Sequence, residues 1–202
     1  MTQYVDHSYF QALAERSPDQ ICARASCVYD EKSQSYIVTA WGHEYQINPE
    51  ARTINLIEKV DYEPHPFFSL FLIYHLLRIQ DSEVKGQWIS EKDLPGGTAF
   101  FRGPHEVPTF LITQAFANDI QKFKHKCDQL GGTPIDLADA AYVFDITPKI
   151  SVAILYWMGD DDFSPEAKLL FDQSIGDHLT LDIIFSLAIE VCKRIGNKSS
   201  DY

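Results

Sequence analysis

The sequence predicts an α+β fold, with an antiparallel sheet built from hairpins and a meander and covered by about four to five helices. Two observations support this class. The candidate strands follow one another across short turns, which is typical of antiparallel pairing. The candidate helices stand between groups of strands and not after every strand, so the alternation of a parallel sheet is missing. We expect residues 1–202 to form one globular domain with a frayed tail at 198–202.

The N-terminal part is predicted to hold a short helix and a three-stranded meander. A modest apolar stripe indicates a helix over 4–14, which Ser17-Pro18 should stop. The expected strands are 21–29, 36–41 and 44–47. Gly42-His43 suits a two-residue hairpin turn between the last two of them. The pattern of 52–60 leaves its structure open.

Two segments predict the central helices. Residues 64–79 are apolar on nearly all sides, so we expect a buried helix there. Residues 107–130 carry an apolar arc opposite a polar face, which predicts one amphipathic helix. Gly131-Gly132 should end it in a left-handed cap.

The C-terminal part is predicted to add a hairpin and two further helices. Residues 141–146 and 150–157 are strongly apolar and suit the inner strands of a sheet. Ser164-Pro165-Glu166 has the order of cap, first-turn proline and first-turn acid, which predicts a short helix. A last helix should open near Thr180, with Lys193 and Arg194 near its negatively polarised end.

The chain is acidic, with a formal net charge of −12. Residues 127–182 hold eleven acidic residues but only two basic ones. Such a surface repels phosphate backbones, so we expect no nucleic-acid partner. Acidity that serves solubility explains the same composition.

Cysteine usage and hydropathy indicate a cytoplasmic protein that does not act at a membrane. The four cysteines form no CxxC pair, which leaves a disulfide framework and a structural zinc or iron–sulfur site unsupported. The first ten residues lack the apolar core of a signal peptide. The most hydrophobic run, 67–79, is too short to span a bilayer.

One loop, 86–105, concentrates four of the ten glycines together with three aromatic residues. Aromatic anchors favour burial, so we expect a packed loop and a ligand surface. Within it, Gly96 and Gly97 could present backbone N–H groups to an anion, or could simply form a tight turn. Trp88, Arg102 and His105 are its other candidate binding residues. His105 beside Arg102 is also a candidate acid–base group, against the alternative of a surface histidine.

Asp160-Asp161-Asp162 is the other candidate feature, because carboxylates attract divalent cations. Adjacent side chains diverge, however, and the alternating acids of a calcium loop are missing. An acidic lead-in to a helix start explains the triplet more simply, so we predict no metal site. Asp160 and Asp161 remain candidate ligand-binding residues.

The remaining reactive residue types give no catalytic constellation. No GxSxG motif and no local cysteine-nucleophile signature is present. His75 lies in the apolar 64–79 segment and is interpreted as a core histidine with satisfied hydrogen bonds. Cys22 and Cys27 are expected to lie in one strand and to face opposite sides, which makes them poor co-ligands.

Several motifs distributed over nearly the whole chain occur together. They are Tyr29-Asp30 with Tyr36 and Gly42, Trp88-Ile89-Ser90 with Asp93-Leu94-Pro95-Gly96-Gly97, Leu130-Gly131-Gly132, Trp157-x-Gly159-Asp160-Asp161-Asp162-Phe163, and Phe171-Asp172-x-Ser174. In these motifs the chain resembles a bacterial and archaeal family described as domain of unknown function 3786. The resemblance implies no activity. Some relatives join the domain to a cysteine-rich iron–sulfur segment, which this sequence lacks, so no electron-transfer role is carried over.

We therefore expect a cytoplasmic, non-catalytic module that binds a small molecule or a protein of unknown identity. Its ligand surface would be formed by the 88–105 and 159–163 loops. The alternative is a small, metal-assisted enzyme in which Asp160 or Asp161 acts with His105 between those loops. A third interpretation is a subunit of a larger assembly. The sequence indicates no particular cofactor and no oligomeric state.

Overall fold

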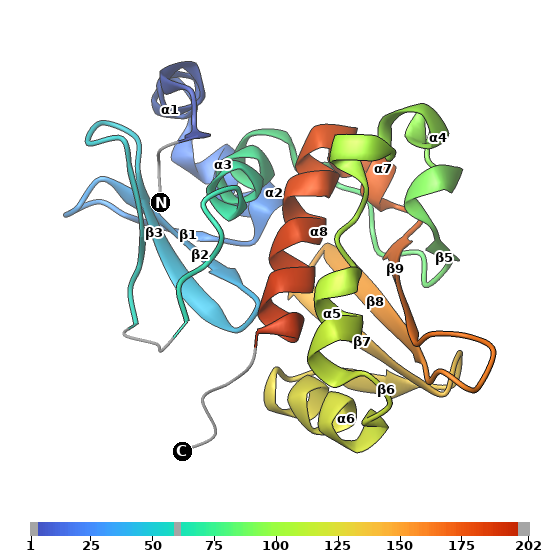
Figure 1. Ribbon diagram of the computed structural model, residues 1–202. Helices are drawn as coiled ribbons and strands as arrows, with labels where there is room; N and C mark the ends of the chain where they lie inside the picture. The colour runs from blue at the N-terminus through green and yellow to red at the C-terminus, as the bar shows by residue number, and fades with distance from the viewer. Residues whose placement is uncertain (1–3, 59–61, 198–202) are drawn as a thin grey trace.

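The computed structural model describes residues 4–58 and 62–197, which form eight α-helices and two antiparallel sheets (Figure 1). The α+β class is therefore confirmed, although the strands divide between two sheets and the helices outnumber the expected four to five. The predicted tail at 198–202 lies outside the described residues. Within those residues, no helix has the length and apolar character needed to cross a membrane.

The first sheet confirms the predicted meander and extends it. Its strands, in spatial order, are β1 (Val28–Asp30), β2 (Ser35–Ala40), β3 (His43–Asn48) and β4 (Thr53–Leu56). The fourth strand comes from the segment whose structure the sequence left open. Trp41 and Gly42, with φ of 49° and 74°, form the turn between β2 and β3. The predicted turn was placed one residue late, because a tight hairpin of this kind needs positive φ at both central residues.

The predicted strand over 21–29 is wrong. Ser17 and Pro18 stop α1 (His7–Ala14), but they also start a second helix, α2 (Pro18–Ala25), in which Ser17 is the N-cap residue. Ile21 and Ala25, one turn apart, are both buried on the inner face of α2. Ser26 ends the helix in a left-handed conformation, so only the last residues of the predicted strand extend into β1.

The second sheet contains the predicted apolar hairpin at its centre. Its spatial order is β5 (Trp88–Ile89), β9 (Glu166–Asp172), β8 (Ile150–Trp157), β7 (Ala140–Thr147) and β6 (Thr133–Ile135). The helix predicted after Ser164-Pro165 is wrong, because this segment is strand β9. Ala167, Leu169 and Phe171 are buried at every second position, and this period of two outweighs the capping pattern.

The predicted helix over 107–130 is two helices, α5 (Phe110–Phe116) and α6 (Ile120–Gln129). Ala117 between them has a φ of 46°, which no α-helix accommodates. The Asp119 side chain then caps α6 by accepting the Lys122 backbone N–H at 2.9 Å. The apolar arc predicted over 107–130 is nevertheless present on both helices, since Phe116 of α5 and Phe123 of α6 are buried.

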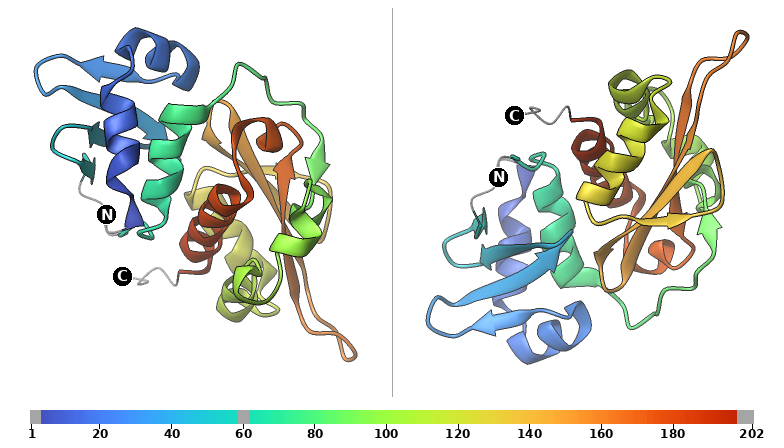
Figure 2. Two further views of the ribbon diagram at one scale, coloured as in Figure 1. Left: turned by 90° about the horizontal axis from the view of Figure 1, so that it is seen from above. Right: turned by 90° about the horizontal axis from the view of Figure 1, so that it is seen from below.

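Two helices occupy the space between the sheets. The predicted buried helix is α3 (Phe68–Arg78), and the predicted last helix is α8 (Leu181–Gly196). Figures 1 and 2 show α8 between the two sheets, beside α3 on one side and α5 on the other. Both helices contribute buried residues to one continuous hydrophobic cluster with residues of both sheets. The position of α8 therefore depends on packing from both sheets.

A buried ion pair on α8 reinforces this junction. Glu190 and Arg194 are 0% and 3% exposed, and their charged atoms lie 3.3 Å apart. The Arg194 guanidinium lies 4.7 Å above the ring of Trp41 and donates a hydrogen bond to the Tyr45 hydroxyl. Trp41 also donates its backbone N–H to Ile146 of the second sheet at 2.7 Å. The sequence placed Arg194 near the helix end but gave no sign that it is buried.

His75 of α3 is buried, as predicted, but only one of its ring nitrogens is bonded. Nε2 donates to the Ala25 carbonyl at 3.2 Å, while Nδ1 has no partner among the described residues. Burial lowers the pKa of His75 to about 4 from its usual 6.5. The imidazole is therefore neutral in the folded protein at neutral pH.

Between about pH 6.5 and pH 4, the unfolded chain binds a proton at His75 and the folded chain does not. Stability should fall as the pH falls through this window, by up to about 3 kcal/mol from this residue. We expect the unfolding free energy of His75→Gln to vary less with pH than that of the wild type. Urea titrations at pH 7.5 and pH 4.5 measure this, and an equal wild-type-to-variant difference at both values would contradict it.

Candidate functional site

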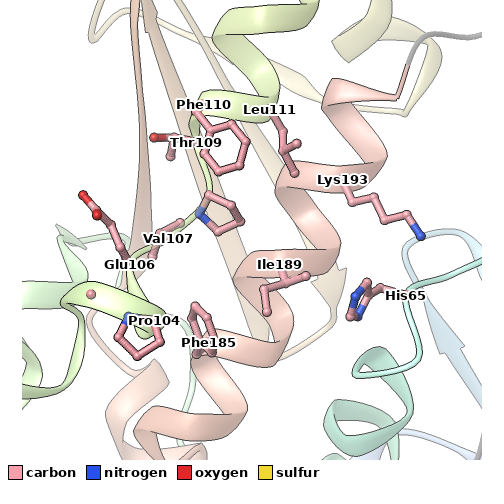
Figure 3. Close-up of a pocket in the computed structure, with 12 residues that line it drawn as sticks. His65, Pro104, Glu106, Val107, Thr109, Phe110, Leu111, Phe185, Ile189 and Lys193 are labelled. Atoms are coloured by element: carbon pink, nitrogen blue, oxygen red, sulfur yellow. The ribbon is translucent and has the colours of Figure 1, made fainter.

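A groove, here called the α8 groove, runs along the exposed side of α8 (Figure 3). It has a volume of about 700 Å³, within the range of small-molecule sites. Its walls are the chain from η3 (Gly103–His105) to the start of α5 on one side and the chain before α3 on the other, and α8 forms its floor. The lining residues are His65, Gly103, Pro104, Glu106, Val107, Pro108, Thr109, Phe110, Leu111, Phe185, Ile189 and Lys193.

The floor of the groove is a second, outward-facing stripe of α8. Phe185, Ile189 and Lys193 are spaced four residues apart, so they lie on one side of the helix. All three are half-buried, whereas the residues of the opposite side are fully buried. The stripe is apolar at one end and carries an ammonium group at the other.

Close packing of α5 against α8 fixes the position of the groove wall that contains Leu111. A Cβ atom on Gly196 would lie 2.6 Å from the Leu111 carbonyl oxygen, so this approach requires glycine. Pro104 lies in the first turn of η3, and Pro108 stands directly before Thr109, the N-cap residue of α5, so proline fixes φ at two points of this wall. The wall is therefore set by backbone constraints and not by side chains alone.

The basic and acidic side chains of the groove lie at opposite ends. Figure 3 shows Lys193 and His65 at one end and Glu106 at the other. His65 Nδ1 accepts the Phe67 backbone N–H at 3.2 Å, which leaves Nε2 to carry the ring proton. Burial, and then the charge of Lys193, lower the pKa of His65, so the ring is a neutral hydrogen-bond donor. That end of the groove offers a cation and an N–H donor to an anionic group.

The predicted loop reaches the edge of this groove at its C-terminal end. His105 is exposed and stacks on Phe100 at 4.5 Å, with Phe185 edge-on at 5.4 Å. It therefore packs against the outside of one groove wall. Arg102 is exposed at the start of η3.

Gly96 and Gly97 form the tight turn that was one of their two interpretations. Gly96 has a φ of 78°, and a Cβ on Gly97 would overlap the Glu91 carbonyl oxygen. The Gly97 N–H donates to Leu94 at 2.8 Å and is not available to an anion. The two glycines let η2 (Glu91–Asp93) and the single-turn α4 (Gly97–Phe100) pack together.

Trp88 lies in β5, opposite Asp172 of β9. Its ring belongs to a small cluster with Trp157 and Leu170 on the outer face of the second sheet. Helices α5, α6 and α8 lie on the other face (Figure 1). Trp88 is therefore remote from the groove.

Asp172, which the sequence did not single out as a site residue, anchors the start of the predicted loop. Its carboxylate accepts the backbone N–H groups of Lys85 and Gly86 at 3.0 and 2.7 Å, and the Ser174 hydroxyl at 2.6 Å. Burial alone would raise the pKa of Asp172, but these hydrogen bonds outweigh it and lower the pKa. The role of Asp172 is structural.

Asp160 and Asp161 lie in the turn between β8 and β9, which projects from the second sheet (Figure 2). Asp160 Oδ1 accepts the backbone N–H groups of Asp162 and Phe163 at 2.9 and 2.8 Å, so it organises its own turn. Asp161 is exposed. Within the described residues, no three His, Cys, Asp or Glu side chains are grouped as metal ligands.

The two predicted loops are not brought together. The turn with Asp160 precedes β9, whereas Trp88 pairs with the last residue of that strand. A strand of seven residues spans about 20 Å, which separates the two loops. The sequence analysis missed the α8 groove because it interpreted Lys193 only as a charge near the helix end and placed the ligand surface on two loops. The spacing of Phe185, Ile189 and Lys193 was the signal that could have found it.

Comparisons of the chain with curated proteins and with solved structures found no match. A family model does match, over residues 17–194. The matched region includes both sheets, α8 as far as Arg194 and every lining residue of the α8 groove. The chain thus belongs to the family Domain of unknown function (DUF3786).

Proposed function

We propose that the protein is a non-catalytic binding module whose α8 groove takes a small molecule with an apolar body and one acidic group. The observation that carries this proposal is the polarity of the groove, which is apolar along its length and has Lys193 and His65 together at one end. Small-molecule sites typically combine such apolar walls with a few placed polar groups.

The apolar part of the groove suits a flat or aliphatic body. Phe185 and Ile189 form the floor, Pro104 and Val107 lie beside them (Figure 3), and Pro108 also lines the groove. Burial of apolar ligand surface contributes about 25 cal/mol per Å² before the costs of association are subtracted. These walls supply affinity without selecting a particular chemical group.

The charged groups set the orientation of the ligand. An acidic group at the Lys193 end gains a charge-assisted hydrogen bond and a second one from the His65 Nε2–H. At the opposite end the Glu106 carboxylate would repel the same group. Because the whole chain carries a net charge of −12, an anion gains from these short-range contacts and not from the overall field.

We also propose a cytoplasmic setting. Its support is that all four cysteines are free, which suits a reducing compartment.

The proposal is tested with two fluorescent probes of the same aromatic shape. Anilinonaphthalene sulfonate carries an acidic group and phenylnaphthylamine carries none. Lys193→Met should weaken binding of the sulfonate by about tenfold, since a hydrogen bond to a charged group contributes at least about 1.5 kcal/mol. The same variant should leave the neutral probe unchanged, because the aliphatic stem of the side chain is retained.

Phe185→Ala should weaken both probes, because it removes part of the floor. The matched controls are Lys122→Met, which changes an exposed residue of α6, and Phe163→Ala, which changes a residue that is 74% exposed in the β8–β9 turn. Both controls should bind like the wild type in fluorescence titrations. If Lys193→Met and Phe185→Ala also bind both probes with wild-type affinity, the α8 groove is not the site.

A further inference from the structure

Two thiols that the sequence assigned to opposite faces of a strand lie in contact. Cys22 is in α2, and Cys27 follows Ser26, the left-handed residue that ends this helix. The reversal at Ser26 brings the Cys27 backbone N–H to the Cys22 carbonyl at 3.4 Å. The two sulfur atoms are then 3.5 Å apart, with the Cys27 thiol donating to Cys22.

The surroundings of this pair differ from those of the other two cysteines. Cys22 and Cys27 are half-buried, so small reagents can reach them. Cys127 and Cys192 are both 0% exposed within the core. The chain therefore holds one accessible pair of thiols and two inaccessible thiols that serve as internal controls.

We propose that Cys22 and Cys27 form a dithiol site that a small disulfide of the glutathione class converts reversibly to an intramolecular disulfide. The sulfur atoms need to approach by about 1.5 Å to reach a bond length of about 2.05 Å, which side-chain rotation can supply. Because the pair is already in contact, closure within the protein competes well with a second external thiol.

The reaction proceeds in two exchanges. The Cys22 thiolate attacks one sulfur of the oxidant, forms a mixed disulfide and releases one thiol. The Cys27 thiolate then attacks the Cys22 sulfur and releases the second thiol. The protein loses two protons and two electrons, and the oxidant takes up both.

The order of these exchanges follows from the environment of Cys27. Burial, and then the neighbouring Cys22 thiol, raise the pKa of Cys27, so it stays protonated while Cys22 is free. Formation of the mixed disulfide removes that neighbouring thiol. Cys27 is therefore the resolving residue of the pair.

The disulfide would fix the junction between α2 and the first sheet. Ala25, between the two cysteines, already accepts the hydrogen bond from His75 of α3. A disulfide between Cys22 and Cys27 would add a covalent constraint to the left-handed turn at Ser26. Oxidation should thus rigidify the connection from α2 to β1 without involving the α8 groove.

The test exposes the reduced full-length chain to oxidised glutathione and then blocks free thiols with N-ethylmaleimide after denaturation. We expect the wild type to carry two alkyl groups instead of four and no bound glutathione, and before alkylation its mass should be lower than that of the reduced chain by two hydrogen atoms. Peptide mapping should locate the bond between Cys22 and Cys27. Reduction with dithiothreitol should restore four alkylated cysteines.

Two single variants and a control distinguish disulfide formation between Cys22 and Cys27 from general reactivity of the thiols. Cys22→Ser and Cys27→Ser should lose the internal disulfide and retain at most one glutathione adduct. Cys127→Ser should still close the Cys22–Cys27 bond, because its side chain lies in the core. The proposal is overturned if the wild type stays fully reduced, keeps glutathione as a stable adduct, or forms a disulfide that includes Cys127 or Cys192.

Discussion

The structure depends on one buried ion pair, Glu190 with Arg194, in the C-terminal half of α8. The Arg194 guanidinium lies between the rings of Trp41 and Tyr62, 4.7 and 4.8 Å from their centroids. Glu190 accepts the His65 backbone N–H at 2.7 Å, which ties the chain before α3 to the same helix. The first sheet, this chain segment and α8 therefore converge on two side chains one helical turn apart.

This arrangement stabilises the fold only while both charges are present. Burial raises the pKa of Glu190, and the Arg194 charge and the His65 N–H act against that rise. Glu190 Oε1 and Arg194 Nε have no hydrogen-bond partner among the described residues. The pair is therefore held by the attraction across 3.3 Å, by the aromatic rings and by the single hydrogen bonds to Tyr45 and His65. Loss of one partner would leave an uncompensated buried charge. The ion pair also positions the groove, since Ile189 precedes Glu190, Lys193 precedes Arg194, and the His65 backbone is bonded to Glu190.

The α+β class, the apolar hairpin and the buried helices α3 and α8 could be predicted from sequence, because hydrophobic period and turn residues determine them locally. The strand predicted over 21–29 failed because Ser17-Pro18 both ends one helix and starts another. The β9 segment failed because a capping pattern was weighed above the alternation around Lys168. The groove could not be predicted in full, since it joins residues as distant as His65, Val107 and Lys193, which only the packing of α8 between two sheets brings together.

In this structure the Glu190–Arg194 pair fixes the position of α8 relative to the two sheets. A double-mutant cycle of unfolding free energies, with Glu190→Gln, Arg194→Met and the double variant, measures it most directly. We expect each single variant to lose about 3–5 kcal/mol and the double variant to lose clearly less than their sum, because it leaves no unpaired charge. Small and additive losses would contradict the account, since they would mean that apolar packing alone fixes α8 and the groove beside it.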